Sequence, residues 1–131
     1  MCGIFGITEK NPKLIKKIID KCSHRGPDGN SIWSNDNLTL GHNLLSITSK
    51  PKDGLQPYVT QKGNVLTYNG EIFNYKYLLK KFKNKFNPKT SCDTEILGWL
   101  LDNFNYNETV CNIIDSMHAF VFFNKKDNEI I

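Results

Sequence analysis

The chain opens with MCGIFGI (residues 1–7), a short apolar run in which glycine occurs twice. A short apolar run that polar residues follow is typical of a buried β-strand, and we expect a strand over residues 2–8. The same stretch places Cys2 directly after the initiator methionine. A first strand that begins at a cysteine is therefore the feature from which both the fold and the chemistry are predicted.

The rest of the chain predicts helices and strands that do not alternate regularly. Asn11-Pro12 is typical of a helix start, and the helix is expected to end before a loop of turn-forming residues at 23–29. This order predicts a mixed α+β fold rather than a repeated strand–helix–strand unit. We expect further strands over residues 38–48 (interrupted at Gly41), 65–68, 119–123 and 129–131, and helices over residues 75–86, 93–104 and 110–114.

Length and composition limit the classes of function. The 131 residues amount to one domain or less. Because there is no membrane-spanning apolar run and no signal peptide, we expect no membrane partner and a cytoplasmic location with free thiols. The net charge of +4 is too small to indicate a nucleic-acid partner. Arg25 is the only arginine, so any function that needs a guanidinium group depends on it.

The cysteines and histidines do not form a metal-site pattern. Four cysteines occur, and none belongs to a C-x-x-C pair. The three histidines share no ligand spacing, so we expect no metal site. Three of the cysteines are expected to be small buried residues, whereas Cys2 has a second interpretation.

Removal of Met1 would place a thiol and a free α-amine together on Cys2. An amine with a reference pKa near 8 can act as the general base for the thiol, without help from a histidine. A cysteine that is merely buried in a first strand explains the same residue. The position alone does not decide between these two interpretations.

Asn69-Gly70 follows the predicted strand over residues 65–68 and is typical of a tight turn. An asparagine side chain and a backbone N–H held on such a turn would supply two hydrogen-bond donors to an oxyanion. From the dipeptide alone, a plain hairpin turn is the favoured interpretation. Asp93, at the start of a predicted helix, either caps that helix or receives the ammonium group of a ligand.

Six motifs follow one another in the sequence. They are MCGIFGI (1–7), HRGPDG (24–29), GHNLLSI (41–47), QP (56–57), YNGEIFN (68–74) and CDTE (92–95). Taken together, in this order and at this approximate spacing, they resemble the class II glutamine amidotransferase domain of asparagine synthetases. The resemblance runs from the first residue to the last, but it does not include the final strands of such a domain.

The resemblance implies a fold, a substrate and a partner. The fold is an α+β sandwich of four αββα layers, the N-terminal-nucleophile hydrolase fold, incomplete at its carboxyl end. Residues 1–131 would be part of a glutamine amidotransferase domain that acts on L-glutamine. The ATP-dependent synthetase domain would be a separate domain or subunit, and ATP and Mg²⁺ would belong to it, so no cofactor is expected in this chain.

Site residues are also implied by position. The resemblance makes Cys2 the nucleophile and makes Asn69 and Gly70 the oxyanion hole. The implied reaction is attack of the thiolate on the side-chain amide, loss of ammonia for asparagine synthesis, and hydrolysis of the glutamyl thioester. The residues implied to hold glutamine or to line its pocket are Leu44, Leu45, Ser46, Ile47, Thr48, Glu71 and Asp93.

Leu44 departs from the family pattern, which has an arginine at this position that binds the α-carboxylate of glutamine. Loss of a charge-assisted bidentate contact costs roughly 1.5–3 kcal/mol. A nearby lysine would supply charge but not the planar fork of a guanidinium. Two hypotheses follow: a glutamine-hydrolysing amidotransferase domain, or a catalytically impaired, truncated homologue that acts as a binding or regulatory piece or is a gene remnant.

Overall fold

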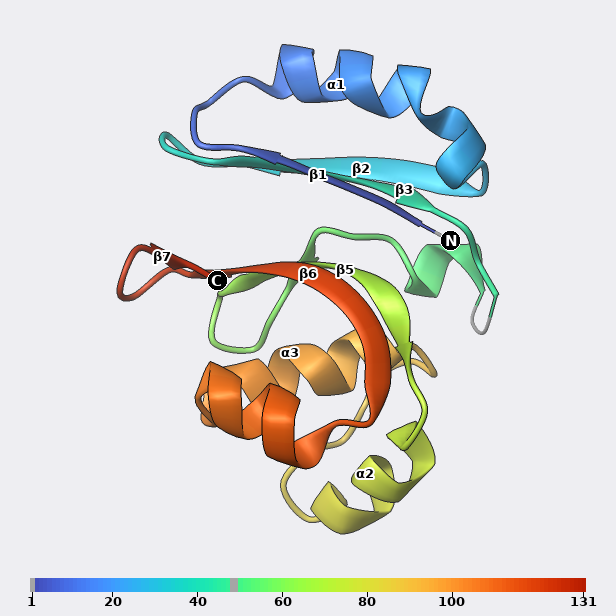
Figure 1. Cartoon of the computed structure of the whole chain (residues 1–131), viewed down its shortest axis with the longest axis vertical. Coiled ribbons are helices and arrows are strands. Elements are labelled where there is room, and N and C mark those ends of the chain that lie inside the picture. Colours follow the sequence, from blue (N-terminus) through green and yellow to red (C-terminus); the bar gives the residue numbers. More distant parts are fainter. Residues whose placement is uncertain (1, 48–49) are drawn as a thin grey trace.

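The computed structural model describes residues 2–47 and 50–131, and within them it confirms a mixed α+β fold (Figure 1). The α-helices are α1 (Pro12–Lys21), α2 (Tyr75–Phe82) and α3 (Asp93–Asn103). The strands are β1 (Gly3–Ile7), β2 (Gly29–Ser34), β3 (Thr39–Leu44), β4 (Tyr58–Val59), β5 (Val65–Ile72), β6 (Ser116–Asn124) and β7 (Glu129–Ile130). Short 3-10 helices span Ser23–Arg25 and Pro51–Asp53, and a π-helix spans Glu108–Ile113.

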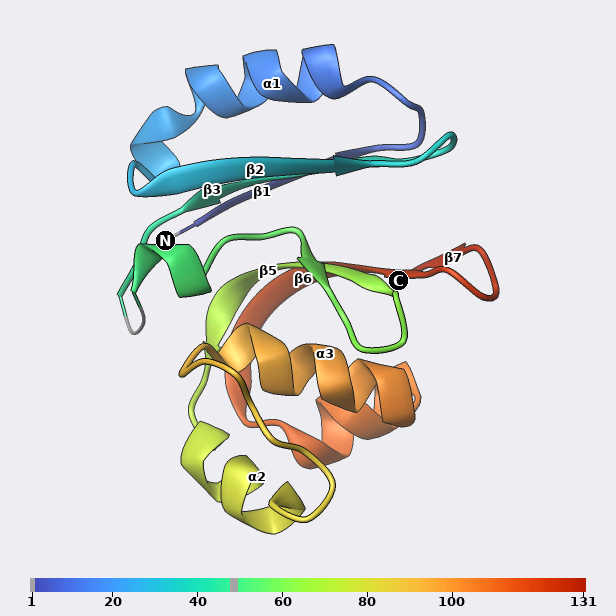
Figure 2. The same ribbon diagram turned by 180° about the vertical axis from the view of Figure 1, so that it is seen from behind.

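Two antiparallel sheets lie face to face. The first has the strand order β1-β3-β2, and the second has the order β4-β5-β6-β7. Figures 1 and 2 show α1 on the outer face of the first sheet, and α2 and α3 on the far side of the second sheet. A buried cluster of Leu38, Leu40, Val65 and Phe123 joins the two sheets.

Helix α1 packs on β3 through two isoleucines. Asn11 is its N-cap, and the Asn11 side chain accepts a hydrogen bond from the Leu14 N–H at 3.0 Å, as the Asn-Pro start predicted. A Cβ at Gly41 would lie 2.5 Å from Cγ2 of Ile15 and 2.9 Å from Cδ1 of Ile19. Gly41 therefore lies inside β3, where its missing side chain makes room for the helix. The prediction that it interrupts the strand is wrong.

Strand β5 runs straight through the dipeptide predicted to be a turn. Asn69 pairs with Ala119 of β6, and Gly70 pairs with His118. The positive φ angles that a tight Asn-Gly turn requires are present at neither residue. The prediction of a turn is therefore wrong, because antiparallel pairing along the whole of β5 outweighs the local preference of two residues.

Helix α3 is buried along most of its length. All residues from 94 to 101 are buried, and Ile96, Leu97 and Leu100 have no exposed surface. They share one hydrophobic core with Leu66 of β5 and Phe122 of β6. This packing fixes the start of α3 against the second sheet, where the candidate site lies.

The remaining helix boundaries differ modestly from those predicted. The helix predicted over residues 75–86 ends at Phe82, and the helix predicted over residues 110–114 is the second half of the π-helix, which starts earlier and ends at Ile113. No helix within residues 2–47 and 50–131 has the length and apolar character that a membrane span requires.

Candidate active site

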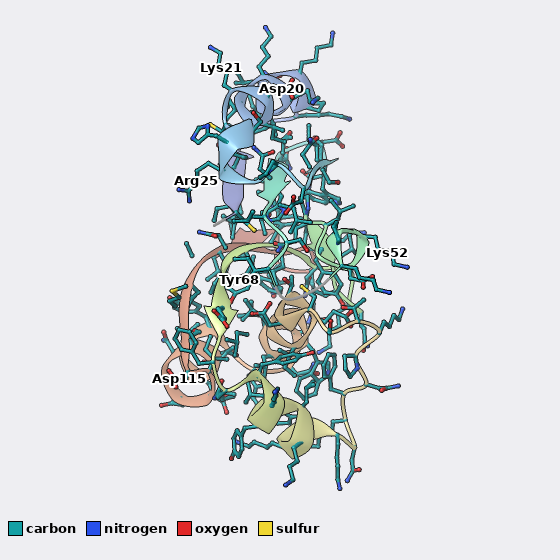
Figure 3. The ribbon with its side chains drawn as sticks, turned by 90° about the vertical axis from the view of Figure 1, so that its right-hand side faces the viewer. Asp20, Lys21, Arg25, Lys52, Tyr68 and Asp115 are labelled. Carbon is teal, nitrogen blue, oxygen red and sulfur yellow. The ribbon has the colours of Figure 1, made fainter. Side chains whose placement is uncertain are left out.

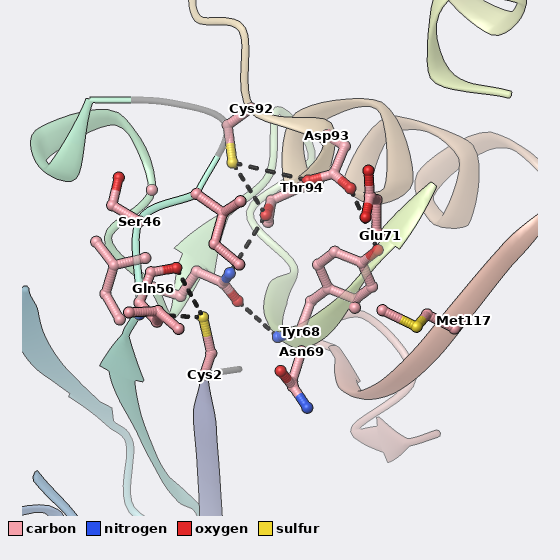
Figure 4. A pocket seen from close by; sticks show the side chains of 15 residues that line it. Cys2, Ser46, Gln56, Tyr68, Asn69, Glu71, Cys92, Asp93, Thr94 and Met117 are labelled. Carbon is pink, nitrogen blue, oxygen red and sulfur yellow. Dashed lines mark hydrogen bonds between the residues drawn. The ribbon is translucent and has the colours of Figure 1, made fainter. Parts of the chain in front are cut away.

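One pocket gathers residues from both sheets and from the start of α3 (Figure 4). Its lining includes residues that precede β1, follow β3, lie along β5 and begin α3. Thr48, a predicted site residue, lies outside the described residues. The other predicted site residues all line this pocket: Cys2, Leu44, Leu45, Ser46, Ile47, Asn69, Gly70, Glu71 and Asp93. The role of each remains a prediction.

Cys2 lies immediately before β1, and the backbone of Leu45 holds its thiol. The Sγ accepts a hydrogen bond from the Leu45 N–H at 3.3 Å and donates one to the Leu45 carbonyl oxygen at 3.6 Å. The Arg25 guanidinium donates from Nη2 to the Cys2 carbonyl oxygen at 3.2 Å. The side chain is half-buried and lines the pocket, so its sulfur is fixed in place and accessible to a ligand.

Asn69 and Gly70 line the pocket from a strand and not from a turn. Asn69 lies on the same face of β5 as Val65, which packs toward the first sheet. A Cβ at Gly70 would lie 2.2 Å from the carbonyl oxygen of Met117, so the close approach of β5 to β6 requires glycine here. A carboxamide and a backbone N–H at this place supply the two kinds of donor that an oxyanion hole uses.

The carboxylate of Asp93 reaches from the start of α3 to β5. Its Oδ2 accepts a hydrogen bond from the Ile72 N–H at 3.0 Å and one from the Tyr68 hydroxyl at 3.3 Å. Burial raises the pKa of Asp93, whereas these hydrogen bonds lower it and the nearby Glu71 raises it. Cys92, not Asp93, is the N-cap of α3. Asp93 is thus oriented by the second sheet before any ligand binds.

Gln56 and Thr94 complete this polar network, although neither residue was predicted to have a role in the site. Gln56 is 5% exposed. Its Oε1 accepts a hydrogen bond from the Tyr68 N–H at 2.6 Å, and its Nε2 donates to the Thr94 hydroxyl at 3.2 Å. Gln56 therefore joins the loop before β4 to both β5 and α3. Its place in the QP motif was the only signal in the sequence.

The segment after β3 forms the opposite wall of the pocket. The Ser46 N–H donates to Oδ2 of Asp28 at 2.8 Å, which connects this segment to the loop before β2. A Cβ at Gly26 would lie 2.5 Å from backbone atoms of Asn43 and Leu44, so the loop reaches the segment only because residue 26 is glycine. The HRGPDG motif thereby supports the pocket wall.

A buried histidine lies between the sheets, behind this wall. His42 shares a face of β3 with Leu44 and is 0% exposed. Neither of its ring nitrogens has a hydrogen-bond partner of good geometry within the described residues, and neither has the Thr67 hydroxyl. Burial lowers the pKa of His42 to about 4, against a weaker opposing interaction with the Tyr68 backbone. The imidazole is therefore neutral at neutral pH.

Within residues 2–47 and 50–131, no group of three or more His, Cys, Asp or Glu side chains is arranged to hold a metal ion.

Known proteins resemble this chain along its whole length. A family model described as "Glutamine amidotransferase domain" matches residues 1–131. The chain is 33% identical, over 98% of its length, to the glutamine-hydrolyzing asparagine synthetase B of Escherichia coli (strain K12). It is 30% identical to glutamine-hydrolyzing asparagine synthetases 1 of Arabidopsis thaliana and Bacillus subtilis (strain 168), over 100% and 98% of its length. It spans 24%, 23% and 21% of these three relatives, respectively.

Proposed function

Because the chain belongs to the glutamine amidotransferase domain family, we propose that its pocket hydrolyses the side-chain amide of glutamine and releases ammonia. The observation that carries this proposal is the placement of Cys2, Asn69, Gly70 and Asp93 in the lining of one pocket. A thiol nucleophile, donors for an oxyanion and a carboxylate for an ammonium group are the parts that such a reaction needs.

Cys2 acts as the nucleophile in this proposal, and removal of Met1 gives it an α-amine as its base. The amine takes the thiol proton, Sγ attacks the carboxamide carbon, and Asn69 and Gly70 bind the oxyanion. The carbon–nitrogen bond then breaks, and ammonia leaves with the proton held by the amine. Water hydrolyses the thioester to a carboxylate and restores the thiol.

Asp93 and Glu71 receive the α-ammonium group of the substrate. The hydrogen bonds from Ile72 and Tyr68 hold the Asp93 carboxylate in one orientation, so little reorganisation is needed on binding. The exposed Glu71 adds a second negative charge at the pocket. A charge-assisted contact with this pair orients the substrate so that its amide faces Cys2.

The same family leads us to propose the N-terminal-nucleophile hydrolase fold for residues 1–131, with four αββα layers. The order of α1, the two facing sheets, and then α2 and α3 supports this assignment (Figure 1). A strand that begins directly after a candidate nucleophile supports it as well. A cytoplasmic location is proposed on the same basis.

The names of the relatives suggest where the ammonia goes. These relatives are asparagine synthetases, and this chain spans about a quarter of their length or slightly less. We therefore propose that the domain supplies ammonia for asparagine synthesis, with a synthetase domain or subunit as its partner. Any ATP and Mg²⁺ would be bound by that partner.

Replacement of the nucleophile tests the proposal. Cys2→Ala should abolish the release of ammonia from glutamine and leave the circular dichroism spectrum unchanged. Cys22→Ala is the matched control, because Cys22 is also half-buried but lies outside the pocket lining. Intact-mass spectrometry should show a protein that lacks Met1 and is alkylated at Cys2 by a diazoketone analogue of glutamine. Equal ammonia release from the wild type and Cys2→Ala would exclude the assigned nucleophile.

Leu44 favours a second candidate, a catalytically impaired homologue that retains the fold, binds glutamine poorly and acts as an interaction or regulatory piece. The side chain at this pocket position is apolar and 4% exposed. In that case glutamine would neither raise the melting temperature nor be hydrolysed. The ammonia assay above separates the two candidates.

A further inference from the structure

The charge of the pocket does not match the charge of free glutamine. Glu71 and Asp93 line the pocket, and no lysine or arginine occurs in the lining within the described part of the chain. Leu44 contributes a buried apolar side chain to the same wall. The described lining therefore provides two carboxylates for a cation and no cationic side chain for a carboxylate.

Three donors next to this wall already have partners. The Arg25 guanidinium donates to the Cys2 carbonyl oxygen, and its side chain is exposed. Figure 3 shows Arg25 reaching outward from the molecule, whereas Tyr68 lies in its interior. The Leu45 N–H donates to the Cys2 Sγ, and the Ser46 N–H donates to a carboxylate of the preceding loop.

The start of α3 offers no better place for an anion. A helix amino terminus attracts negative charge because its first N–H groups are unpaired within the helix. Here the first turn carries both Asp93 and Glu95. The Glu95 carboxylate accepts hydrogen bonds from the Lys89 N–H and from the Thr90 hydroxyl. The positive electrostatic potential of this helix terminus is thus already neutralised by Asp93 and Glu95.

Free glutamine would consequently bind with an oppositely charged partner for its α-ammonium group and none for its α-carboxylate. Its ammonium group is attracted by Asp93 and Glu71, but its α-carboxylate would lie against an apolar wall, near two like charges. A charged group that leaves water without a partner is costly, and like charges in contact add to that cost. A neutral amide in place of the carboxylate avoids both penalties.

We propose that this pocket selects a glutamine whose α-amine is free and whose α-carboxyl group is in neutral amide linkage, as in L-glutaminamide or a glutamine at the amino terminus of a peptide. The inference rests on the proposed function and specifies its substrate class. Leu44 is the residue that determines this specificity. Ile47 and Met117 line the pocket and are 77% and 50% exposed, so they offer an apolar rim to the group beyond the amide.

The chemistry is the amide hydrolysis already described. Sγ of Cys2 forms a bond to the side-chain carbonyl carbon, the bond to the amide nitrogen breaks, and ammonia leaves. Water then cleaves the thioester, so that the side chain becomes a carboxylate while the α-amide is untouched. The product of glutaminamide is isoglutamine, and the product of the peptide begins with glutamate.

A comparison of three substrates, each assayed with the wild-type chain, tests the proposal. We expect kcat/KM for L-glutaminamide and for a peptide with amino-terminal glutamine to exceed that for L-glutamine about tenfold or more. Cys2→Ala is the blank, because amino-terminal glutamine also loses ammonia by spontaneous cyclisation. Mass spectrometry separates the hydrolysed product from the cyclised one. A preference for the peptide over glutaminamide would identify peptides as the source of the substrate, and the reverse would identify small amides.

Leu44→Arg sharpens the test, with Leu44→Met as the control for a change of side chain without a change of charge. Arginine should raise kcat/KM for free glutamine relative to glutaminamide about tenfold. If that variant fails to fold, titration of Cys2→Ala with both ligands replaces it, and glutaminamide should bind more tightly.

Two outcomes contradict the proposal in distinguishable ways. In the first, the wild type hydrolyses free glutamine as fast as glutaminamide or faster, and Arg25→Ala loses activity on glutamine but not on glutaminamide. This result would show that Arg25 binds the carboxylate. The specificity proposal would then be wrong while the hydrolase function stands. Absence of ammonia release from all three substrates would instead overturn the hydrolase function, and the specificity proposal with it.

Discussion

The two sheets hold their parts of the pocket by different means. On the side of the first sheet, backbone atoms of Leu45 hold Cys2, and the loop before β2 packs at Gly26 directly against the backbone of the pocket wall. In the second sheet, the side chains of Gln56 and Asp93 bond to the backbone of β5. The first wall therefore depends on close backbone packing, and the second depends on a polar side-chain network.

Gly26→Ala tests the backbone packing of the first wall and should have the largest effect. The new Cβ would lie 2.5 Å from backbone atoms of Asn43 and Leu44, which cannot move independently of the pocket wall. We expect a loss of about 3 kcal/mol or more in the free energy of unfolding, together with loss of ammonia release. Urea denaturation measures the first quantity.

Gly29→Ala is the control for this change. Its Cβ would meet only the end of the Leu55 side chain, at 3.0 Å, and that side chain is 43% exposed. The cost should stay below about 1 kcal/mol. Similar losses in the two variants would show that close backbone approach is not what holds the first wall.

His42 is buried between the two sheets and should make the stability of the protein sensitive to acid. Its pKa is about 4 in the folded state against 6.5 as the ordinary value, so between these limits the unfolded chain binds a proton that the folded chain does not. The stability that depends on a neutral His42 is therefore fully present above pH 6.5, and it is lost as the pH drops toward 4. At about 1.4 kcal/mol per pH unit, this amounts to about 3 kcal/mol.

His42→Leu isolates this contribution, because leucine has a similar volume and no titrating group. The free energy of unfolding of the variant, relative to the wild type, should increase progressively as the pH falls from 6.5 to 4. Since neither ring nitrogen of His42 has a hydrogen-bond partner of good geometry within the described residues, the variant should not be less stable at neutral pH. His24→Gln, at an exposed position, keeps His42, so its stability should fall on acidification in parallel with that of the wild type. Parallel curves for wild type and His42→Leu would contradict the prediction.

The contrast between the walls also explains what the sequence could predict. The first strand and the α1 start at Asn11 depend on local contacts that short motifs specify, and the structure places them as expected. The turn at Asn69-Gly70 failed because a local preference competes with a strand partner some fifty residues later in the chain. Gln56 was missed as a site residue for the same reason. Its partners Tyr68 and Thr94 are distant in the sequence.

Gln56→Leu tests the polar network of the second wall. The change leaves the Tyr68 N–H without the acceptor that it has at 2.6 Å, and this N–H lies in a buried strand. A loss of about 2 kcal/mol in the free energy of unfolding is expected, measured by urea denaturation. Gln61→Leu, at an exposed position, is the matched control and should change stability little. Equal effects would mean that the network contributes nothing beyond packing.

Tyr68→Phe should have the smallest effect on stability and the most specific effect on the site. It removes only the hydroxyl that donates to Asp93 at 3.3 Å, so we expect a loss of about 1 kcal/mol or less. This hydrogen bond lowers the pKa of Asp93 against the raising effect of burial. Its removal should raise that pKa further, so that KM for an ammonium-bearing substrate begins to rise at a higher pH as the solution is acidified. Tyr77→Phe is the control, because Tyr77 is 60% exposed. A pH profile of KM that is identical in wild type and Tyr68→Phe would show that Asp93 does not bind the substrate ammonium, whatever the change in stability.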